Sequence, residues 1–160
     1  MENSVTELGA ASQLSPSVTD LLARFRRGEA TPVAMAEAIG MRLVEVESGR
    51  AVFDLEVDLA RHANPMGTLH GGVLCSLADS AMGMAYAATL DADATFATLE
   101  LKINFLRPMW RGRLTATGRV VQAGRSVGLI ECDVVDDEGR LVARASSTCM
   151  TLRGEQGSGR

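Results

Sequence analysis

The sequence predicts an α+β fold in which an antiparallel six-stranded sheet wraps around one long central helix, with a helical extension at the N-terminus. Several segments alternate between apolar and polar residues with a period of two, which is the pattern of half-buried strands. Among them lies one long segment of small apolar residues, 71–90, that has no polar stripe of its own. Strands that curl around this segment would bury it, and a length of 160 residues suits one domain with one such core.

The first 39 residues are expected to lie outside this domain. Residues 1–16 show no periodic pattern, whereas 17–39 are expected to be helical, with Ser17 or Thr19 as the N-cap and Gly28 as a stop. The C-terminal run GEQGSGR is rich in glycine and polar groups. The chain therefore divides into an N-terminal helical extension at 1–39, a domain at 40–153 and a disordered tail at 154–160.

The strands are expected to run antiparallel. The cleanest alternation is found at 52–59, where Phe53 and Leu55 share a face, and at 98–105, where Thr98 lies on the polar face opposite Leu99. Four further strands are expected at 41–48, 113–122, 127–135 and 140–152. Polar turns such as AGRS and DDEGR are short enough to join neighbouring strands as hairpins.

Composition and charge exclude several classes of protein. Glu2 and Glu7 stand where a secretory signal would need basic and apolar residues, so we expect a cytoplasmic protein. A membrane span at 71–90 would place Asp79 near the bilayer centre at a cost of roughly 3 kcal/mol. A pI near 5.2 with few aromatic residues argues against a nucleic-acid partner. The widely spaced cysteines predict reduced thiols, not disulfides: Cys75, Cys132 and Cys149.

One segment carries residues suited to chemistry. In NPMGTLHGGVLCSLADSAMGMAYAATL, residues 64–90, the only Asp, Glu, Lys or Arg is Asp79, nine positions after His70. Thioester hydrolysis needs fixed N–H donors for the carbonyl oxygen and a carboxylate that activates water or attacks directly. Gly71 and Gly72 open the expected helix and let a ligand approach its unpaired N–H groups, and Asp79 supplies the carboxylate.

The same residues resemble a known family. The run NPMGTLHGG followed by LADS, with an order of two strands, one helix and four strands, resembles the hot dog fold acyl-CoA thioesterases, most closely the phenylacetate-degradation (PaaI-like) branch. The likeness covers about residues 40–152. It implies hydrolysis of an aryl- or medium-chain acyl-CoA to a free acid and coenzyme A, with neither metal nor cofactor. A non-catalytic acyl-CoA-binding or sensing protein on the same fold is the alternative.

The resemblance also implies roles for individual residues. It makes Asp79 the nucleophile or the general base, Asn64 a group that holds the carbonyl or the attacking water, and Thr98 a group that orients the water or the acid. Simpler interpretations stay open. Asp79 could be a buried acid bonded to Ser76 or Ser80, Asn64 a turn residue, and Thr98 an ordinary strand residue.

The other titratable residues near this segment are less suited to a catalytic or metal-binding role. His70 either positions the glycine turn or bonds near the thioester, and we favour a structural role over proton transfer. A zinc site made by His62, His70 and Asp79 is not expected, because no ligand spacing favours it. Cys75 is not expected to be a nucleophile, because Asp79 one helical turn further on raises the pKa of its thiol.

Helix geometry separates the expected N–H donor from the expected catalytic carboxylate of the same chain. Asp79 lies eight residues after Gly71, which is about 12 Å along a helix axis. A carboxylate that attacks the carbonyl carbon must come within about 3.5 Å of it. We therefore expect a dimer with shared sites, in which Gly71 of one subunit and Asp79 of the other serve one substrate. The resemblance implies the same arrangement, usually doubled to a homotetramer.

The charge pattern favours an anionic ligand. The chain carries a net charge of −4, yet residues 101–130 contain six Lys or Arg residues and no acid. The phosphates of coenzyme A fit such a tract. Gly72 at the helix start, Arg107 before Pro108, and Arg125 with Ser126 in the AGRS turn are the expected coenzyme A contacts, although any single arginine could equally be a solvated strand residue.

Overall fold

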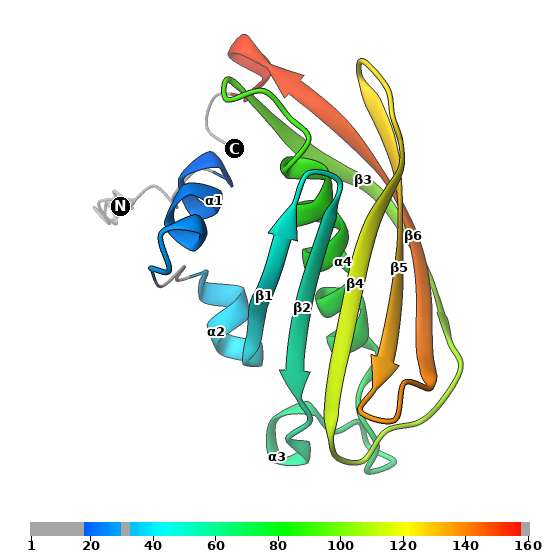
Figure 1. Cartoon of the computed structure of the whole chain (residues 1–160). Coiled ribbons are helices and arrows are strands. Elements are labelled where there is room, and N and C mark those ends of the chain that lie inside the picture. The colour runs from blue at the N-terminus through cyan, green and yellow to red at the C-terminus, as the bar shows by residue number, and fades with distance from the viewer. Residues whose placement is uncertain (1–17, 30–32, 158–160) are drawn as a thin grey trace, which may run out of the picture.

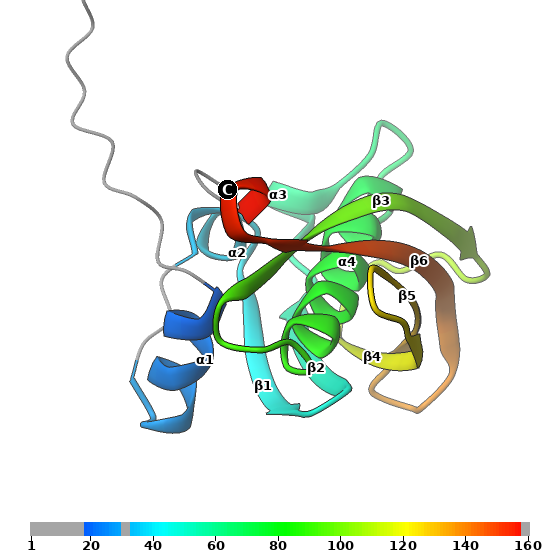
Figure 2. The same ribbon diagram turned by 90° about the horizontal axis from the view of Figure 1, so that it is seen from above.

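The computed structural model describes residues 18–29 and 33–157. Its helices are α1 (Val18–Arg26), α2 (Ala34–Ile39), α3 (Leu59–His62), α4 (Gly71–Ala87) and the 3-10 helix η1 (Gly154–Gly157). Its strands are β1 (Met41–Glu47), β2 (Arg50–Glu56), β3 (Ala94–Phe105), β4 (Arg113–Ala123), β5 (Val127–Asp136) and β6 (Leu141–Arg153). They form one antiparallel sheet in the order β1, β2, β4, β5, β6, β3, which curls around α4 (Figures 1 and 2). The predicted α+β architecture is confirmed.

Several element boundaries differ from the prediction. The helical segment expected at 17–39 consists of two separate helices, and Thr19 lies inside α1 while Ser17 lies outside the described residues. Gly28 follows α1 with φ of +70°, a conformation that suits glycine, so its predicted role as a stop is confirmed. Of the predicted disordered tail, 154–157 form η1, and 158–160 lie outside the described residues.

The strand predicted at 52–59 ends early because Asp58 starts a helix. β2 ends at Glu56, and the Asp58 side chain accepts a hydrogen bond of 2.9 Å from the Ala60 N–H, which caps α3. Leu59 is therefore the first residue of α3 and not part of the strand face. Local capping chemistry overrides the alternating pattern at this point.

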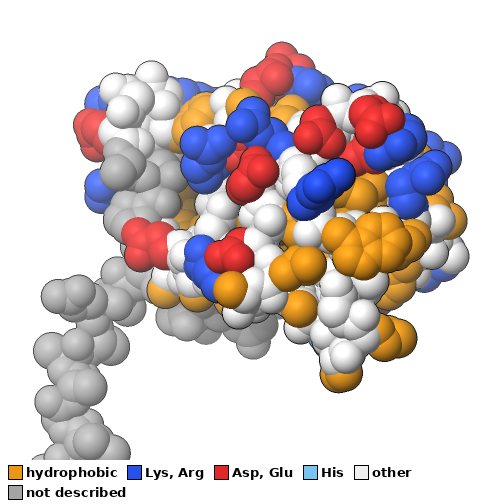
Figure 3. Space-filling view, turned by 90° about the horizontal axis from the view of Figure 1, so that it is seen from below, with side chains coloured by type: hydrophobic (Ala, Val, Ile, Leu, Met, Phe, Trp, Pro, Cys, Tyr) orange, Lys and Arg blue, Asp and Glu red, His pale blue; other side chains and the backbone are white. Residues whose placement is uncertain are grey.

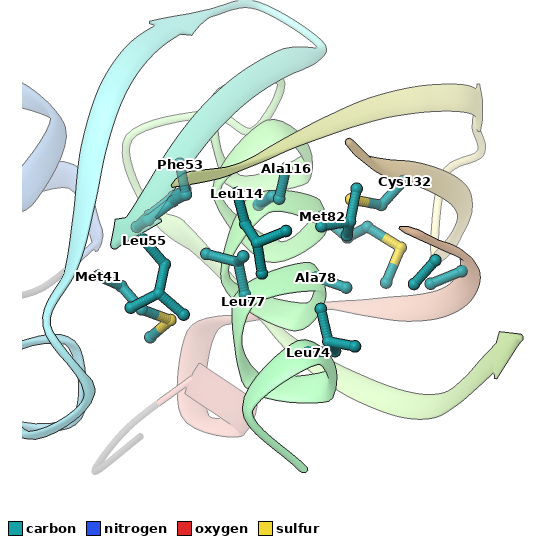
Figure 4. Close-up of a cluster of buried hydrophobic side chains, with 14 of the residues drawn as sticks. Met41, Phe53, Leu55, Leu74, Leu77, Ala78, Met82, Leu114, Ala116 and Cys132 are labelled. Carbon is teal, nitrogen blue, oxygen red and sulfur yellow. The ribbon is translucent and has the colours of Figure 1, made fainter. Parts of the chain in front are cut away.

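The core lies between α4 and the concave face of the sheet. Leu77, Met82 and Leu114 are completely buried, and their side chains meet between helix and sheet (Figure 4). The helix approaches β4 closely because Gly118 has no side chain: a Cβ there would lie 2.3 Å from the Ala81 carbonyl oxygen. Any residue larger than glycine at 118 would force the helix away from the sheet.

One face of α4 stays open, contrary to the prediction that the sheet buries the helix all round. Gly72 and Asp79 are exposed and Ser76 is half-buried, and their spacing of four and three residues places them along one side of the helix. β3 forms one edge of the sheet and is 12 residues long. Among the described helices, none is long and apolar enough to span a membrane.

Candidate functional site

Asp79 on α4 and Thr98 on β3 come together at the open face of the helix. The Thr98 hydroxyl donates a hydrogen bond of 3.1 Å to Asp79 Oδ1. Both residues are exposed in the single chain. The second carboxylate oxygen, Oδ2, accepts no hydrogen bond from any residue that the structure describes. The carboxylate is thus held in one orientation while half of it stays available to a ligand.

A β-bulge places Thr98 beside Asp79. Thr98 pairs with Cys149 and Glu100 pairs with Thr148, which leaves Leu99 between them without a partner. The extra residue shifts the alternation by one, so Thr98 lies on the helix-facing side of the sheet together with the buried Cys149. Strict alternation predicted Thr98 on the outer, polar face, and that prediction is wrong. Leu99 is 53% exposed instead.

The interpretation of Asp79 as a buried acid satisfied by a neighbouring serine is also wrong. Asp79 is exposed, and the Ser76 hydroxyl donates to the Gly72 carbonyl oxygen one turn back at 3.0 Å. Within residues 18–29 and 33–157, neither Ser76 nor Ser80 bonds to Asp79. A charged residue in an otherwise apolar helix therefore faces solvent next to a cavity.

The start of α4 offers one free amide. His70 is the N-cap, and its Nδ1 accepts a hydrogen bond of 2.8 Å from the Gly72 N–H. This supports the structural role for His70, and it means that the Gly72 amide is not free for coenzyme A. No hydrogen bond among the described residues uses the Gly71 N–H. Gly71 is thus the residue whose amide is available at the positive end of the helix.

Phe105 covers Gly71, a contact that the sequence did not reveal. A Cβ on Gly71 would lie 2.9 Å from Phe105 Cζ. Phe105 closes β3 and is 54% exposed, so its ring rests on the helix start without being enclosed. Gly71 is needed here for close approach of an aromatic ring from its own chain, in addition to the approach of a ligand that the sequence predicted.

Asn64 is fixed by its own turn. Its Oδ1 accepts from the Met66 and Thr68 N–H groups at 2.9 and 3.1 Å, and its Nδ2 donates to the Thr68 hydroxyl at 2.8 Å. The turn interpretation of Asn64 is therefore confirmed. One of the two Nδ2 hydrogens remains unused among the described residues, so the side chain can still donate one hydrogen bond.

The predicted catalytic residues divide between two cavities of the single chain. Asn64 and Gly71 line a cavity of about 370 Å³ together with Phe105. Asp79 and Thr98 line another cavity, of about 190 Å³, which lies further along α4. One chain therefore separates the N–H donors from the carboxylate, as the helix geometry predicts.

The two arginines predicted to bind coenzyme A do not meet within one chain. Arg107 follows β3 at the end of the sheet where Phe105 pairs with Ala143. Arg125 lies in the β4–β5 hairpin at the opposite end, with Ser126 beside it, and both are exposed (Figure 1).

A wide cavity lies next to Arg107. It measures about 830 Å³ and is lined by Arg107, Trp110, Arg111 and Arg140, among others. Arg140 is engaged by Asp136 and Glu138 at 2.7 and 2.8 Å. Seen from below, basic, acidic and hydrophobic side chains lie side by side on this end of the molecule (Figure 3). Trp110 is 55% exposed there, a feature that the sequence analysis missed.

The remaining candidates have structural roles. His62 is buried: its Nδ1 accepts from the Asp58 N–H at 3.1 Å, and its Nε2 lies 2.8 Å from the Ile39 carbonyl oxygen. The three cysteines are free thiols. Burial raises the pKa of the Cys75 thiol, and the Asp79 carboxylate raises it further, as predicted. Burial also raises the pKa of Cys132, to about 12.

Comparisons with known proteins identify the family to which this chain is similar. A family model described as the thioesterase superfamily matches residues 66–143, which include Gly71, Asp79 and Thr98. The chain is 34% identical over 116 residues to the 1,4-dihydroxy-2-naphthoyl-CoA hydrolase of Listeria monocytogenes, a match that covers 72% of this chain and 94% of that protein. It is 36% identical over 111 residues to the acyl-coenzyme A thioesterase PaaI of Escherichia coli, covering 69% and 76% of the two chains.

Solved structures of proteins from the same family have a similar fold. The structure of the E. coli PaaI protein from the phenylacetic acid degradation operon superposes with a TM-score of 0.74 at 27% identity, covering 88% of this chain and 97% of that one. A phenylacetic acid degradation-related protein from Ralstonia eutropha gives a TM-score of 0.73 at 35% identity, covering 81% and 98%. The hot dog fold expected from the sequence is thereby confirmed.

Proposed function

Because this chain belongs to the thioesterase superfamily, we propose that it hydrolyses the thioester of an aryl- or medium-chain acyl-CoA, with Asp79 as the catalytic carboxylate. The observation that supports this most directly is the hydrogen bond from Thr98 to Asp79 Oδ1, which leaves Oδ2 free at an open cavity. A carboxylate oriented by one oxygen and free at the other suits a nucleophile or a general base.

The reaction needs no group beyond the chain and water. Asp79 either removes a proton from a water molecule that attacks the carbonyl carbon, or attacks that carbon itself to form an anhydride that water then hydrolyses. The carbon–sulfur bond breaks, coenzyme A leaves as the thiolate and takes up a proton, and the acid is released. The Gly71 N–H stabilises the negative charge on the carbonyl oxygen, and the unused Nδ2 hydrogen of Asn64 is positioned in the same cavity to assist.

A second copy of the chain completes each site. Asp79 and Gly71 of one chain stand about 12 Å apart along α4. Asp79 lies beside β3, the long free edge of the sheet, because Thr98 of that strand bonds to it. A partner that extends the sheet at this edge would also cover the open face of α4. Two chains related by a two-fold axis would then present Gly71 of each to Asp79 of the other, and two such dimers would form the tetramer.

Coenzyme A is assigned to the end of the molecule that carries Arg107 and Arg111, where Asp137 and Glu138 also line the cavity and Glu138 pairs with Arg140. Arg107 borders both the cavity that holds Gly71 and the 830 Å³ cavity that holds Trp110 and Arg111. Phosphates of coenzyme A would pair with the guanidinium groups, and the exposed indole ring of Trp110 offers a face on which adenine can stack. Arg125 and Ser126 would reach a substrate held mainly by the partner subunit.

One assay tests the catalytic assignment. Thiol release from phenylacetyl-CoA, benzoyl-CoA and hexanoyl-CoA is measured for the unchanged protein and for Asp79→Asn. We expect a loss of about 10²- to 10⁴-fold in kcat for the variant. Asn keeps the size of Asp and an oxygen that can accept from the Thr98 hydroxyl, so the melting temperature should stay close to that of the unchanged protein and serves as the folding control. Tight binding of acyl-CoA esters with turnover that is slow and equal in both proteins would instead identify the non-catalytic binding protein.

A further inference from the structure

The N-terminal extension lines part of the cavity beside Asp79. The volume of this cavity is about 190 Å³. Leu21 of α1 and Val33, Met35 and Ala36 at α2 form one wall, while α4 and β3 contribute the opposite wall with Met84 and Phe96. The extension lies beside β1 and the open side of the helix in both views of the fold (Figures 1 and 2).

The cavity is polar at one end only. Asp79, Ser80 and Thr98 bring their oxygen atoms to the end next to the proposed reaction centre. The other residues in its lining are alanine, glycine, leucine, valine, methionine and phenylalanine, which offer no side-chain hydrogen-bond partner. A group that enters past Asp79 therefore leaves water for an apolar surface. A hydroxyl at its far end would lose its hydrogen bonds with water and find no replacement in these side chains.

The volume suits a small group. A cavity of about 150 Å³ lined by Leu, Ile and Phe side chains binds benzene. At 190 Å³ this cavity accommodates one aromatic ring or a short alkyl chain. Gly83 also contributes to its shape, since a Cβ at that position would lie 3.0 Å from Phe96 Cζ. The Phe96 ring is itself held edge-on by Tyr86, with centroids 6.0 Å apart.

Contacts with the core hold the wall in place. The last carbonyl groups of α2 are bonded by two side chains of α3: Arg61 Nη2 donates to the Glu37 oxygen at 3.3 Å and to the Ala38 oxygen, and His62 Nε2 bonds to the Ile39 oxygen at 2.8 Å. The Gly40 N–H closes the helix end by donating to the Ala36 oxygen at 2.7 Å. The carboxyl end of α2 is thus anchored to α3, which keeps the helix that carries Met35 and Ala36 beside the cavity.

We propose that α1 and α2 form the end wall of the acyl site and select acyl groups that are small and end without a hydroxyl, such as phenylacetyl or hexanoyl, over hydroxylated aryl groups and long chains. This inference rests on the proposed function, because it assigns the occupant of the cavity as the acyl group of the thioester that Asp79 attacks. Val33 and Met35 are specificity-determining residues in this assignment.

The test compares substrates and wall variants of the full chain. Met35 is 55% exposed, so Met35→Ala should fold normally while opening the wall. We expect it to raise kcat/KM for decanoyl-CoA relative to hexanoyl-CoA about tenfold, and Met35→Trp to lower kcat/KM for phenylacetyl-CoA by a similar factor. Glu37→Gln is the matched control, since Glu37 lies on the same helix, is exposed and does not line the cavity. It should leave every ratio unchanged.

A second comparison addresses the apolar end of the cavity. The unchanged protein should favour phenylacetyl-CoA over 4-hydroxyphenylacetyl-CoA by about 10- to 100-fold in kcat/KM, the range expected for an added hydroxyl in an apolar site. Hydrolysis with ratios unaffected by both Met35 variants, or a preference for the hydroxylated ester, would overturn the inference and leave the proposed function standing. Failure to hydrolyse any ester would overturn the proposed function. Calorimetric binding of the two phenylacetyl esters would then still decide whether the wall excludes the hydroxyl.

Discussion

Thr98 on the edge strand donates a hydrogen bond of 3.1 Å to Asp79 on the open face of the central helix. This contact joins two elements whose relative position depends on the whole sheet, because β3 reaches α4 only after pairing with β6. It leaves Asp79 Oδ2 without a hydrogen-bond partner among the described residues, and Asp79 lines a cavity together with residues of the N-terminal extension.

Thr98 is predicted to act as a positioning residue. Thr98→Val keeps the shape of the side chain and removes the hydroxyl, so the Asp79 carboxylate loses its fixed orientation. We expect kcat to fall about tenfold or more while KM for phenylacetyl-CoA changes little. Thr98→Ser retains the hydroxyl and should recover most of the loss. Equal losses in both variants would contradict a role through this hydrogen bond.

The shared site can be tested by mixing inactive subunits. Asp79→Asn removes the carboxylate, and Gly71→Val blocks the helix start, where even a Cβ would lie 2.9 Å from Phe105 Cζ. A heterodimer of the two variants has one site with both defects and one intact site, so a pure heterodimer should show about half of the unmodified activity. A mixture of equal amounts after complete exchange, in which about half of the dimers are heterodimers, should show about a quarter. Verified heterodimers without activity would show that one chain supplies both groups.

His70 is predicted to cap the start of α4 and not to transfer a proton. Its Nδ1 accepts from the Gly72 N–H, which is the task of a helix N-cap. His70→Asn can make the same bond, so kcat should stay within a few-fold of the original value, whereas His70→Ala should cost about 1 kcal/mol in the free energy of unfolding. Denaturant titration measures the second effect. A loss of about 10²-fold or more in kcat for His70→Asn would assign the ring a proton-transfer role.

Cys75 provides a pH-dependent probe of the charge on Asp79. Burial and then the Asp79 carboxylate raise the pKa of this thiol, so at a given pH less of it is thiolate than for an ordinary cysteine. Asp79→Asn removes the charge and should lower the pKa, so that alkylation by iodoacetamide reaches its half-maximal rate at a lower pH. Cys132 and Cys149 are buried, so labelling reports on Cys75.

Thr98→Val is the matched control for this experiment, since it keeps the charge on Asp79. Its alkylation profile should follow that of the unchanged protein. Identical profiles for all three proteins would contradict the interaction between Asp79 and Cys75.

Local patterns were enough to place most of the fold. All six strands appear where alternation of apolar and polar residues predicts them, to within a few residues at each end, and α4 begins at Gly71 as expected. The clearest error falls where a local feature competes with the alternation: Asp58 caps α3, so β2 ends at Glu56 and not at Leu59. Capping and turn chemistry act over a few residues and leave no periodic signal.

The sequence alone determined that Asp79 and Gly71 belong to one helix and lie too far apart to act on one thioester within a chain, since helix rise depends only on residue number. The tertiary structure decided the rest. The bulge at Leu99 turns Thr98 toward Asp79, the sheet leaves one side of α4 uncovered, and Arg61 and His62 hold the end of α2, which lines the cavity beside Asp79. Each of these depends on contacts between residues distant in sequence, which periodicity and spacing do not encode.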